Sequence, residues 1–314
     1  MYINSTGYYV PEARIDNEYF FNVNGLTADW ILQRTGIKTR SKASADENVD
    51  TMGIAAVEDA KKNLPYDIKD VDLIVAAHYC AYDTVATLAH VVQRHFGITH
   101  AKAVYASSAC SSFINGLEII EGYFASGKAK KALLVCSEHN TYYANETNPK
   151  DGHLWGDAAV AYFISAEPQG PADIKIDTIF TEGLGDIGKG SAGVRLRPKE
   201  DGICMPDGRD VFLHACKYMI YALDHALEQS GIKRSDLSRL ICHQANKRIV
   251  AQVAHMLEIP LDKFENNIEE YGNTGSASAA LVFAQKRDEF KKGEKIALLV
   301  FGGGYSCGAF IVTI

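Results

Sequence analysis

An α/β fold made of two similar halves is the architecture that the sequence predicts. Continuous apolar runs at residues 132–135 and 297–300 are typical of strands buried on both faces of a sheet. A set of landmarks recurs in the same order in both halves of the chain, and the one linker rich in proline and glycine, Glu167–Pro171, lies between them. We therefore expect two mixed sheets that share a helical layer, with a boundary between residues 1–168 and 169–314.

The landmarks of the repeat keep their spacing. A short apolar, strand-like run ends at His78 in the first half and at His243 in the second, and another histidine follows 12 residues later in both. A glycine likewise follows 17 residues after Cys110 and 17 residues after Ser276. Duplication of one α/β unit explains these matches, and a site is expected where the two copies meet.

Composition narrows the class of protein. The chain has 314 residues, 47% hydrophobic and 23% charged, as in globular proteins, and no apolar stretch approaches the ~18 residues of a membrane span. A formal charge of −7 disfavours nucleic-acid and anionic-membrane partners. The start of the chain has no secretory pattern, and the seven cysteines include no C-x-x-C pair. These features predict a cytoplasmic protein with reduced thiols and no metal site.

Cys110 is the first residue with a chemical signal. It stands where small residues give way to apolar positions at helical spacing, through Phe113, Leu117 and Ile120. This pattern predicts a turn that enters a buried helix. The N-terminus of a helix favours a thiolate, although an inert core cysteine is the alternative.

Three further segments carry polar or glycine-rich patterns. His243, in Ile-Cys-His-Gln-Ala-Asn, directly follows a strand-like run, where α/β proteins place their sites. Asn273 lies among small residues in Tyr-Gly-Asn-Thr-Gly, and three glycines at residues 302–304 permit close backbone approach to an oxyanion. A structural histidine, a plain turn and a nucleotide-binding loop are the alternatives, but neither G-x-G-x-x-G nor a Walker pattern is present.

Together the four segments resemble β-ketoacyl-acyl-carrier-protein synthase, type III, of the thiolase superfamily. The resemblance covers nearly the whole chain and includes Asp29–Ile37, Trp155-Gly-Asp and the run from Asp207 to Phe212. It implies a duplicated thiolase-like fold with αβαβα layers. It also maps the nucleophile to Cys110, the catalytic partners to His243 and Asn273, and the oxyanion N–H groups to Cys110 and Gly303.

The reaction implied by this resemblance is a decarboxylating Claisen condensation. Cys110 takes an acyl group from acyl-coenzyme A or another thioester donor, and malonyl-acyl-carrier protein then loses carbon dioxide to give a 3-oxoacyl product. No metal or redox cofactor is expected, and the partners are an acyl carrier protein and a second copy in a homodimer. A specialised acyltransferase of secondary metabolism and a noncatalytic partner subunit remain as alternatives.

Five residues are expected to bind substrate. Trp30 and Arg34 match coenzyme A contacts of the family, although residues 147–151 lack the arginine that the family pattern has there. Asn246 is the last residue of the histidine motif and Arg248 follows it; Arg248 is expected to attract an acidic carrier, with a solvated helix face as the alternative. Thr84 falls where a bulky aromatic often closes the acyl pocket, which predicts a starter longer than acetyl.

Overall fold

The computed structural model describes residues 1–314 and contains one large mixed sheet of nine strands. Apolar runs account for its central strands, since every residue of β7 is buried. In spatial order the strands are β11 (Leu237–Cys242), β12 (Lys295–Gly302), β13 (Ser306–Thr313), β8 (Ile174–Gly183), β1 (Tyr2–Tyr9), β7 (Ala158–Ser165), β6 (Lys131–Glu138), β4 (Leu73–Ala77) and β5 (Lys102–Ala106).

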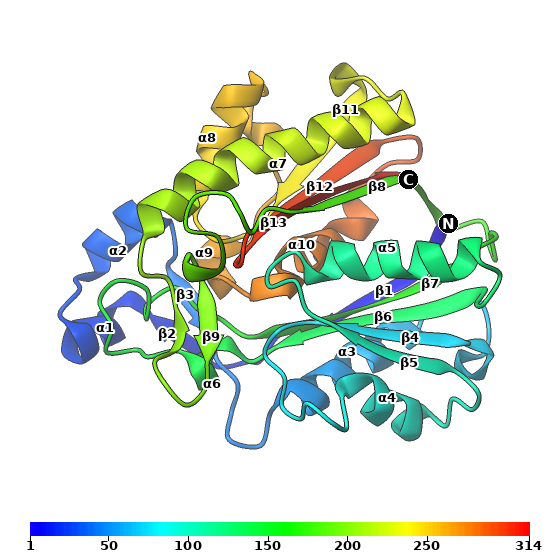
Figure 1. Ribbon diagram of the computed structural model, residues 1–314, viewed down its shortest axis with the longest axis horizontal. Coiled ribbons are helices and arrows are strands. Elements are labelled where there is room, and N and C mark those ends of the chain that lie inside the picture. Colours follow the sequence, from blue (N-terminus) through cyan, green and yellow to red (C-terminus); the bar gives the residue numbers. More distant parts are fainter.

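The two sheets expected from the sequence are joined in the structure and form the two ends of this single nine-stranded sheet. Strand β1 pairs with β7 along its length but with β8 only at Tyr2 and Ile3. The halves therefore separate from this short junction and leave room for helices between them, as Figure 1 shows. The sequence did not predict the junction, because pairing between residues so far apart in the chain leaves no local pattern.

Helices complete the five layers (Figure 1). Two apolar helices fill the middle layer and pack on strands of both halves, and two more cover each outer face. The middle helices are α5 (Ser112–Ala125) and α10 (Ser278–Lys286), and the outer pairs are α3 (Val49–Lys61) with α4 (Leu88–Phe96) and α7 (Gly208–Ser230) with α8 (Lys247–Leu257). The predicted α/β class and the layered αβαβα architecture are confirmed.

The internal repeat appears in the pairing of the strands. In the first half β4 lies parallel to β6, which pairs antiparallel with β7; in the second half β11, β12 and β13 repeat this order. A counterpart of β5 is reduced to one bridge between Leu240 and Phe264. Strand β7 ends at Ser165 and β8 begins at Ile174. The boundary at residue 168 stays a prediction.

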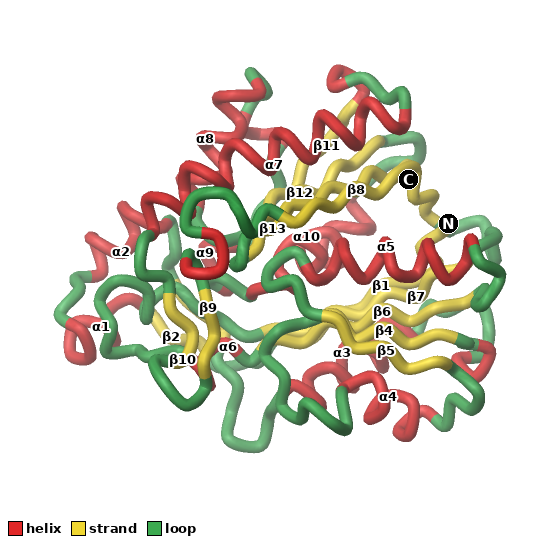
Figure 2. The backbone as a smooth tube through the Cα atoms, viewed as in Figure 1, coloured by secondary structure: helices red, strands yellow, loops and turns green.

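Short elements gather at one end of the layers, as Figure 2 shows for β2, β9 and β10. Both halves contribute to this end, and the segment of residues 10–48 reaches the second half by packing on α8 and α9. The short elements are β2 (Arg14–Asp16), α1 (Asn17–Asn24), α2 (Ala28–Thr35), β3 (Thr39–Ser41), α6 (Asn140–Tyr143), β9 (Arg195–Arg197), β10 (Gly202–Cys204) and α9 (Ile268–Tyr271). No helix has the length and apolar character needed to cross a membrane.

Candidate active site

Cys110 lies in a strained turn between β5 and α5. The preceding residue, Ala109, has a φ of +49°, in the left-handed region that residues other than glycine rarely adopt. Gly302 packs against this turn so closely that a Cβ there would lie 3.0 Å from the backbone nitrogen of Cys110. The predicted turn into a buried helix is therefore confirmed, and the glycine run supplies the close approach that the sequence suggested.

The environment of the Cys110 thiol is less favourable to a thiolate than the sequence predicted. Burial and the nearby carboxylate of Glu138 raise the pKa of Cys110 to about 12, against the lowering effect of hydrogen bonds from the Gly303 N–H, the Tyr79 hydroxyl and its own N–H. Burial therefore outweighs the thiolate-favouring effect that the sequence analysis expected from the helix N-terminus. The N–H groups of Gly303 and Cys110 remain the donors at the sulfur, because the Tyr79 hydroxyl donates its proton to Asn140 Oδ1 at 2.7 Å.

His243 follows β11 directly, as predicted. Burial lowers the pKa of its imidazole to about 4, so the ring is neutral at pH 7. Its Nδ1 lies 2.6 Å from the Ser278 hydroxyl, whose oxygen also accepts the Gln244 N–H at 3.2 Å. When the Ser278 hydroxyl donates its proton to Nδ1, the ring proton of the neutral imidazole resides on Nε2.

Asn273 is oriented by its own loop. Its Oδ1 accepts the Gly275 N–H at 3.0 Å, which leaves the Nδ2 protons available as donors. The backbone of Asn273 pairs with Trp155 in an isolated bridge, and its carbonyl accepts the Gly156 N–H at 3.0 Å. Gly156 is required there, because a Cβ would lie only 1.9 Å from the Tyr271 carbonyl oxygen.

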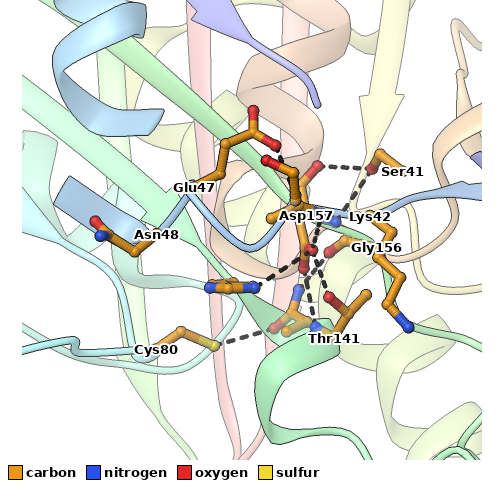
Figure 3. Close-up of polar contacts among 12 residues, drawn as sticks. Ser41, Lys42, Glu47, Asn48, Cys80, Thr141, Gly156 and Asp157 are labelled. Atoms are coloured by element: carbon orange, nitrogen blue, oxygen red, sulfur yellow. Dashed lines mark hydrogen bonds and ion pairs between the residues drawn. The ribbon is translucent and has the colours of Figure 1, made fainter. Parts of the chain in front are cut away.

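Asp157 anchors the segment behind this loop (Figure 3). Its backbone exchanges hydrogen bonds with the Ser41 hydroxyl, and its buried carboxylate accepts the Thr141 hydroxyl at 2.5 Å. Asn140, on the same turn as Thr141, donates to the Gly156 carbonyl at 2.8 Å and to the Asn273 carbonyl at 3.3 Å. Through these hydrogen bonds, the Trp155-Gly-Asp motif holds the Asn273 loop in place.

Two cavities meet at Cys110. The first, called the reaction cavity, has a volume of about 40 Å³ and is lined by Cys110, His243 and Asn273 together with apolar residues of α7 and α8. The second, called the side chamber, has a volume of about 260 Å³ and is lined by Cys110, Trp155 and mainly apolar residues of the excursion between β8 and α7. A group bound to the sulfur can thus extend into one cavity while a second ligand approaches through the other.

A larger cleft of about 480 Å³ lies apart from Cys110. It is lined by Lys42, Glu47, Asn48 and His139, among others, and Figure 3 shows the first three of these near Asp157. None of the predicted site residues lines it. The size of this cleft alone does not identify it as the reaction site. A reaction site requires convergent polar groups, which are found at Cys110.

Glu138 is a buried group near Cys110 that sequence reasoning missed. Its carboxylate, at the end of β6, accepts the Tyr79 N–H at 3.2 Å, the Cys80 N–H at 3.0 Å and the Ser276 hydroxyl. Burial raises its pKa to about 7. Its place at the end of an apolar run, like that of His78 and His243, is the signal that would have identified it.

Four of the five predicted substrate-binding residues come together where α2 meets α8. Trp30 is 39% exposed, and the Arg34 guanidinium lies 5.4 Å from the centre of its ring. Asn246 caps α8 and donates to the Arg34 carbonyl at 3.1 Å. Arg248 is exposed in the first turn of α8 and forms no ion pair, whereas the neighbouring Lys247 pairs with Glu269.

Thr84 does not lie in this group. It is exposed in the loop between β4 and α4 and lines neither the reaction cavity nor the side chamber. Within one chain it therefore does not close an acyl pocket. Its neighbour Val85 is 85% exposed.

The chain offers no arrangement typical of a metal centre. No group of three or more histidine, cysteine, aspartate or glutamate side chains is placed to hold an ion. All seven cysteines are free thiols, and six of them are buried. The N–H groups of Cys110 and Gly303 and the Asn273 amide are hydrogen-bond donors, which suits stabilisation of an anion formed from a carbonyl group.

Comparison with known proteins identifies the family. Residues 106–181 match the family model described as 3-oxoacyl-(acyl-carrier-protein) synthase III, and residues 227–314 match the model for the C-terminal part of the same family. The β-ketoacyl-(acyl-carrier-protein) synthase III of Acholeplasma laidlawii (strain PG-8A) is 32% identical over 99% of this chain and 98% of the relative.

Solved structures show the same architecture. The crystal structure of 3-oxoacyl-(acyl-carrier-protein) synthase III from Aquifex aeolicus VF5 superposes with a TM-score of 0.92 at 28% identity, covering 100% of this chain and 99% of that one. The priming β-ketosynthase from the R1128 polyketide biosynthetic pathway superposes with a TM-score of 0.90 at 25% identity, covering 99% and 95%.

Proposed function

The chain belongs to the 3-oxoacyl-(acyl-carrier-protein) synthase III family, and from this premise we propose that it condenses an acyl starter with malonyl-acyl-carrier protein in a decarboxylating Claisen reaction. The observation that carries the proposal is the convergence of Cys110, His243 and Asn273 on one cavity. They come from three separate segments of the chain and present a nucleophile and two sets of donors to the same volume.

The first half-reaction transfers the starter to Cys110. The sulfur loses its proton and attacks the thioester carbonyl of the donor, a new carbon–sulfur bond forms, and the donor thiol leaves with a proton. We assign stabilisation of the oxyanion of the tetrahedral intermediate to the N–H groups of Cys110 and Gly303, whose hydrogen bonds lower the pKa of the thiol. Because the resting thiol is protonated, its deprotonation is part of this step.

The second half-reaction forms the carbon–carbon bond. His243, through Nε2–H, and Asn273, through Nδ2–H, donate to the thioester carbonyl of the malonyl group and stabilise the enolate as carbon dioxide leaves. The enolate carbon attacks the acyl-Cys110 carbonyl, the carbon–sulfur bond breaks, and the thiol is reprotonated. Ser278 acts as a positioning residue that selects the tautomer of His243.

Several features support the remaining assignments. Strand β5 ends the sheet with one edge unpaired, and Tyr82 and Val85 expose apolar surface on the nearby loop, which supports a homodimer. Exposed Arg248 supports an acidic carrier, and Trp30 with Arg34 supports acyl-coenzyme A as a donor. The free thiols support a cytoplasmic location. The donors described above provide for both half-reactions, so we propose that no cofactor takes part.

A specialised condensing enzyme of secondary metabolism is the second candidate. It is favoured by the similarity to a priming β-ketosynthase of a polyketide pathway. Its chemistry would be the same, and its starter would differ. A noncatalytic subunit is disfavoured, because Cys110, His243 and Asn273 are all present and meet in one cavity.

The proposal is tested by incubating the purified protein with a short acyl thioester and malonyl-acyl-carrier protein. We expect release of carbon dioxide and formation of a 3-oxoacyl-carrier product in equal amounts. Release of carbon dioxide without a condensed product would show that the protein acts only as a decarboxylase. If neither carbon dioxide nor a condensed product forms with any starter, the proposal is contradicted.

A further inference from the structure

The turn that carries the Gly303 N–H has few contacts of its own to fix its shape. Pairing between β12 and β13 ends at Gly302 and Ser306, and residues 303–305 form the turn beyond it. Gly303 and Gly304 have no side chains, and Gly304 has a φ of +90°, so both have the conformational freedom of glycine. A donor that stabilises an oxyanion must be held in position before the reaction, so the turn requires a contact from outside.

Tyr305 is the one residue of this turn with a side chain, and that side chain is buried. Its hydroxyl donates to Asp210 Oδ2 at 2.6 Å. Asp210 lies in the first turn of α7, a helix that packs on β8, β12 and β13. A hydrogen bond to a charged acceptor is stronger than one between neutral groups, so this bond joins the glycine turn firmly to a helix that the sheet holds in place.

The Tyr305 ring also packs on the segment that forms a wall of both cavities. Gly193 lies so close to the ring that a Cβ there would be 2.5 Å from the Cε1 of Tyr305. The next residue, Val194, lines both the reaction cavity and the side chamber, and Gly303 packs against its side chain. The carboxylate oxygen that accepts the Tyr305 hydroxyl also accepts the Lys189 N–H at 3.0 Å. One buried side chain therefore connects the glycine turn, this wall and α7.

We propose that Tyr305 is a positioning residue for the acylation step, whose hydrogen bond to Asp210 holds the turn in the conformation that presents the Gly303 N–H to Cys110. This inference rests on the proposed function, which gives the Gly303 N–H its role at the oxyanion. Without the bond, the two glycines can move the N–H out of line, and a displaced donor stabilises the transition state less than a fixed one. The donors that serve the enolate belong to other segments and are unaffected.

The first test measures acylation by a short-chain pantetheine thioester, followed by intact-protein mass at several donor concentrations. Tyr305→Phe removes only the hydroxyl, and we expect the maximal rate to fall at least ~10-fold with little change in the KM for the donor, because the lost contribution acts in the transition state. Asp210→Asn keeps an oxygen acceptor and should stay near the wild-type rate, whereas Asp210→Ala should reproduce the loss. Tyr218→Phe is the matched control, because Tyr218 is a buried residue of α7 whose hydroxyl forms no hydrogen bond within the chain.

The second test separates positioning from a general loss of structure. The Gly303 N–H lowers the pKa of the Cys110 thiol, so its displacement in Tyr305→Phe should slow alkylation of Cys110 by iodoacetamide at pH 9 at least ~3-fold, as followed by peptide mass. A loosened fold would instead expose the buried thiol and speed alkylation. Alkylation that is unchanged or faster, acylation at the wild-type rate, or an equal loss in Tyr218→Phe would overturn the inference. Absence of any acylation in the wild-type chain would contradict the proposed function, and alkylation would still test the role of Tyr305.

Discussion

Asn273 shows how one side chain acquires a single role from its hydrogen bonds. Its amide oxygen is occupied by the Gly275 N–H, so only the Nδ2 donors face the reaction cavity. Cys110 has its own donors in the Gly303 and Cys110 N–H groups. The two half-reactions therefore depend on different donors.

The first prediction follows from this separation. Asn273→Ala should still accept an acyl group on Cys110 but lose condensation by at least ~100-fold, the loss typical of removing one oxyanion donor. Mass spectrometry measures the first step, and product formation from malonyl-carrier measures the second. Condensation near the wild-type rate, or equal loss in both steps, would show that the assignment of Asn273 to the enolate is wrong.

The second prediction concerns the carboxyl group of Glu138. Its folded-state pKa, about 7, lies above the ordinary value of 4.5, so the folded chain binds the proton more tightly than the unfolded chain. This contribution to stability is fully present below about pH 4.5 and is lost as the pH rises through about 7. Relative to wild type, Glu138→Gln should therefore gain up to about 3 kcal/mol in the free energy of unfolding over this range.

Urea unfolding at pH 4.5 and pH 7.5 measures this difference. The buried histidines titrate in both proteins and cancel in the comparison. If the difference between variant and wild type is the same at both pH values, the raised pKa of Glu138 is contradicted. Such a group escapes sequence reasoning, because its pKa depends on burial by segments that are distant in the chain.

At the scale of elements, the sequence predicted those whose signal is local. The apolar runs predicted β6 and β12, and the apolar spacing after Cys110 predicted α5. Ser278, the first residue of α10, was missed as a partner of His243, because the two are 35 residues apart and meet only when α10 packs beside β11. The reduced counterpart of β5 was also unpredicted, since the repeat in the sequence does not indicate which strand lacks a partner.

The third prediction belongs to the first turn of α8. Arg248 is exposed there and has no ion-pair partner, so it is available to an acidic carrier. Arg248→Glu should raise the KM for malonyl-carrier roughly 10-fold, equivalent to about 1.4 kcal/mol, with little change for malonyl-pantetheine. The difference between wild type and variant in the KM for malonyl-carrier should shrink as salt is added, because salt screens the attraction between charges.

Lys128→Glu provides the matched control, since Lys128 is exposed in the turn after α5, at the end of that helix away from Cys110. It should leave the KM for the carrier unchanged. Equal effects of Arg248→Glu on the carrier and on the small substrate would indicate a structural role in α8.

At the scale of the whole molecule, the duplicated halves and the layered fold were predictable because the chain repeats its landmarks at fixed spacing. The site at the seam was predictable for the same reason, since Cys110 comes from the first half and His243 and Asn273 from the second. The junction of the two sheets and the volume of each cavity were not, because they depend on long-range pairing and packing.

The fourth prediction is the mass of the assembly. We expect a homodimer of twice 34.4 kDa in sedimentation equilibrium at micromolar concentration. Val85→Glu should shift the equilibrium toward the monomer, because it replaces an exposed apolar side chain with a charged one. The substitution should cost the isolated fold little stability, since Val85 is 85% exposed in one chain. Leu261→Glu is the control, at an apolar residue that is 50% exposed on the second half. A monomeric wild-type chain would contradict the dimer.

The most direct test of the whole mechanism is the fate of the acyl group on the sulfur of Cys110. The protein is acylated with a short thioester, the adduct is located by peptide mass spectrometry, and malonyl-acyl-carrier protein is then added. We expect an adduct on Cys110 that is absent in Cys110→Ala and disappears as the 3-oxoacyl product forms. An adduct on Cys136 or Cys242, or one that persists while product accumulates, would contradict the assignment of Cys110 as the nucleophile.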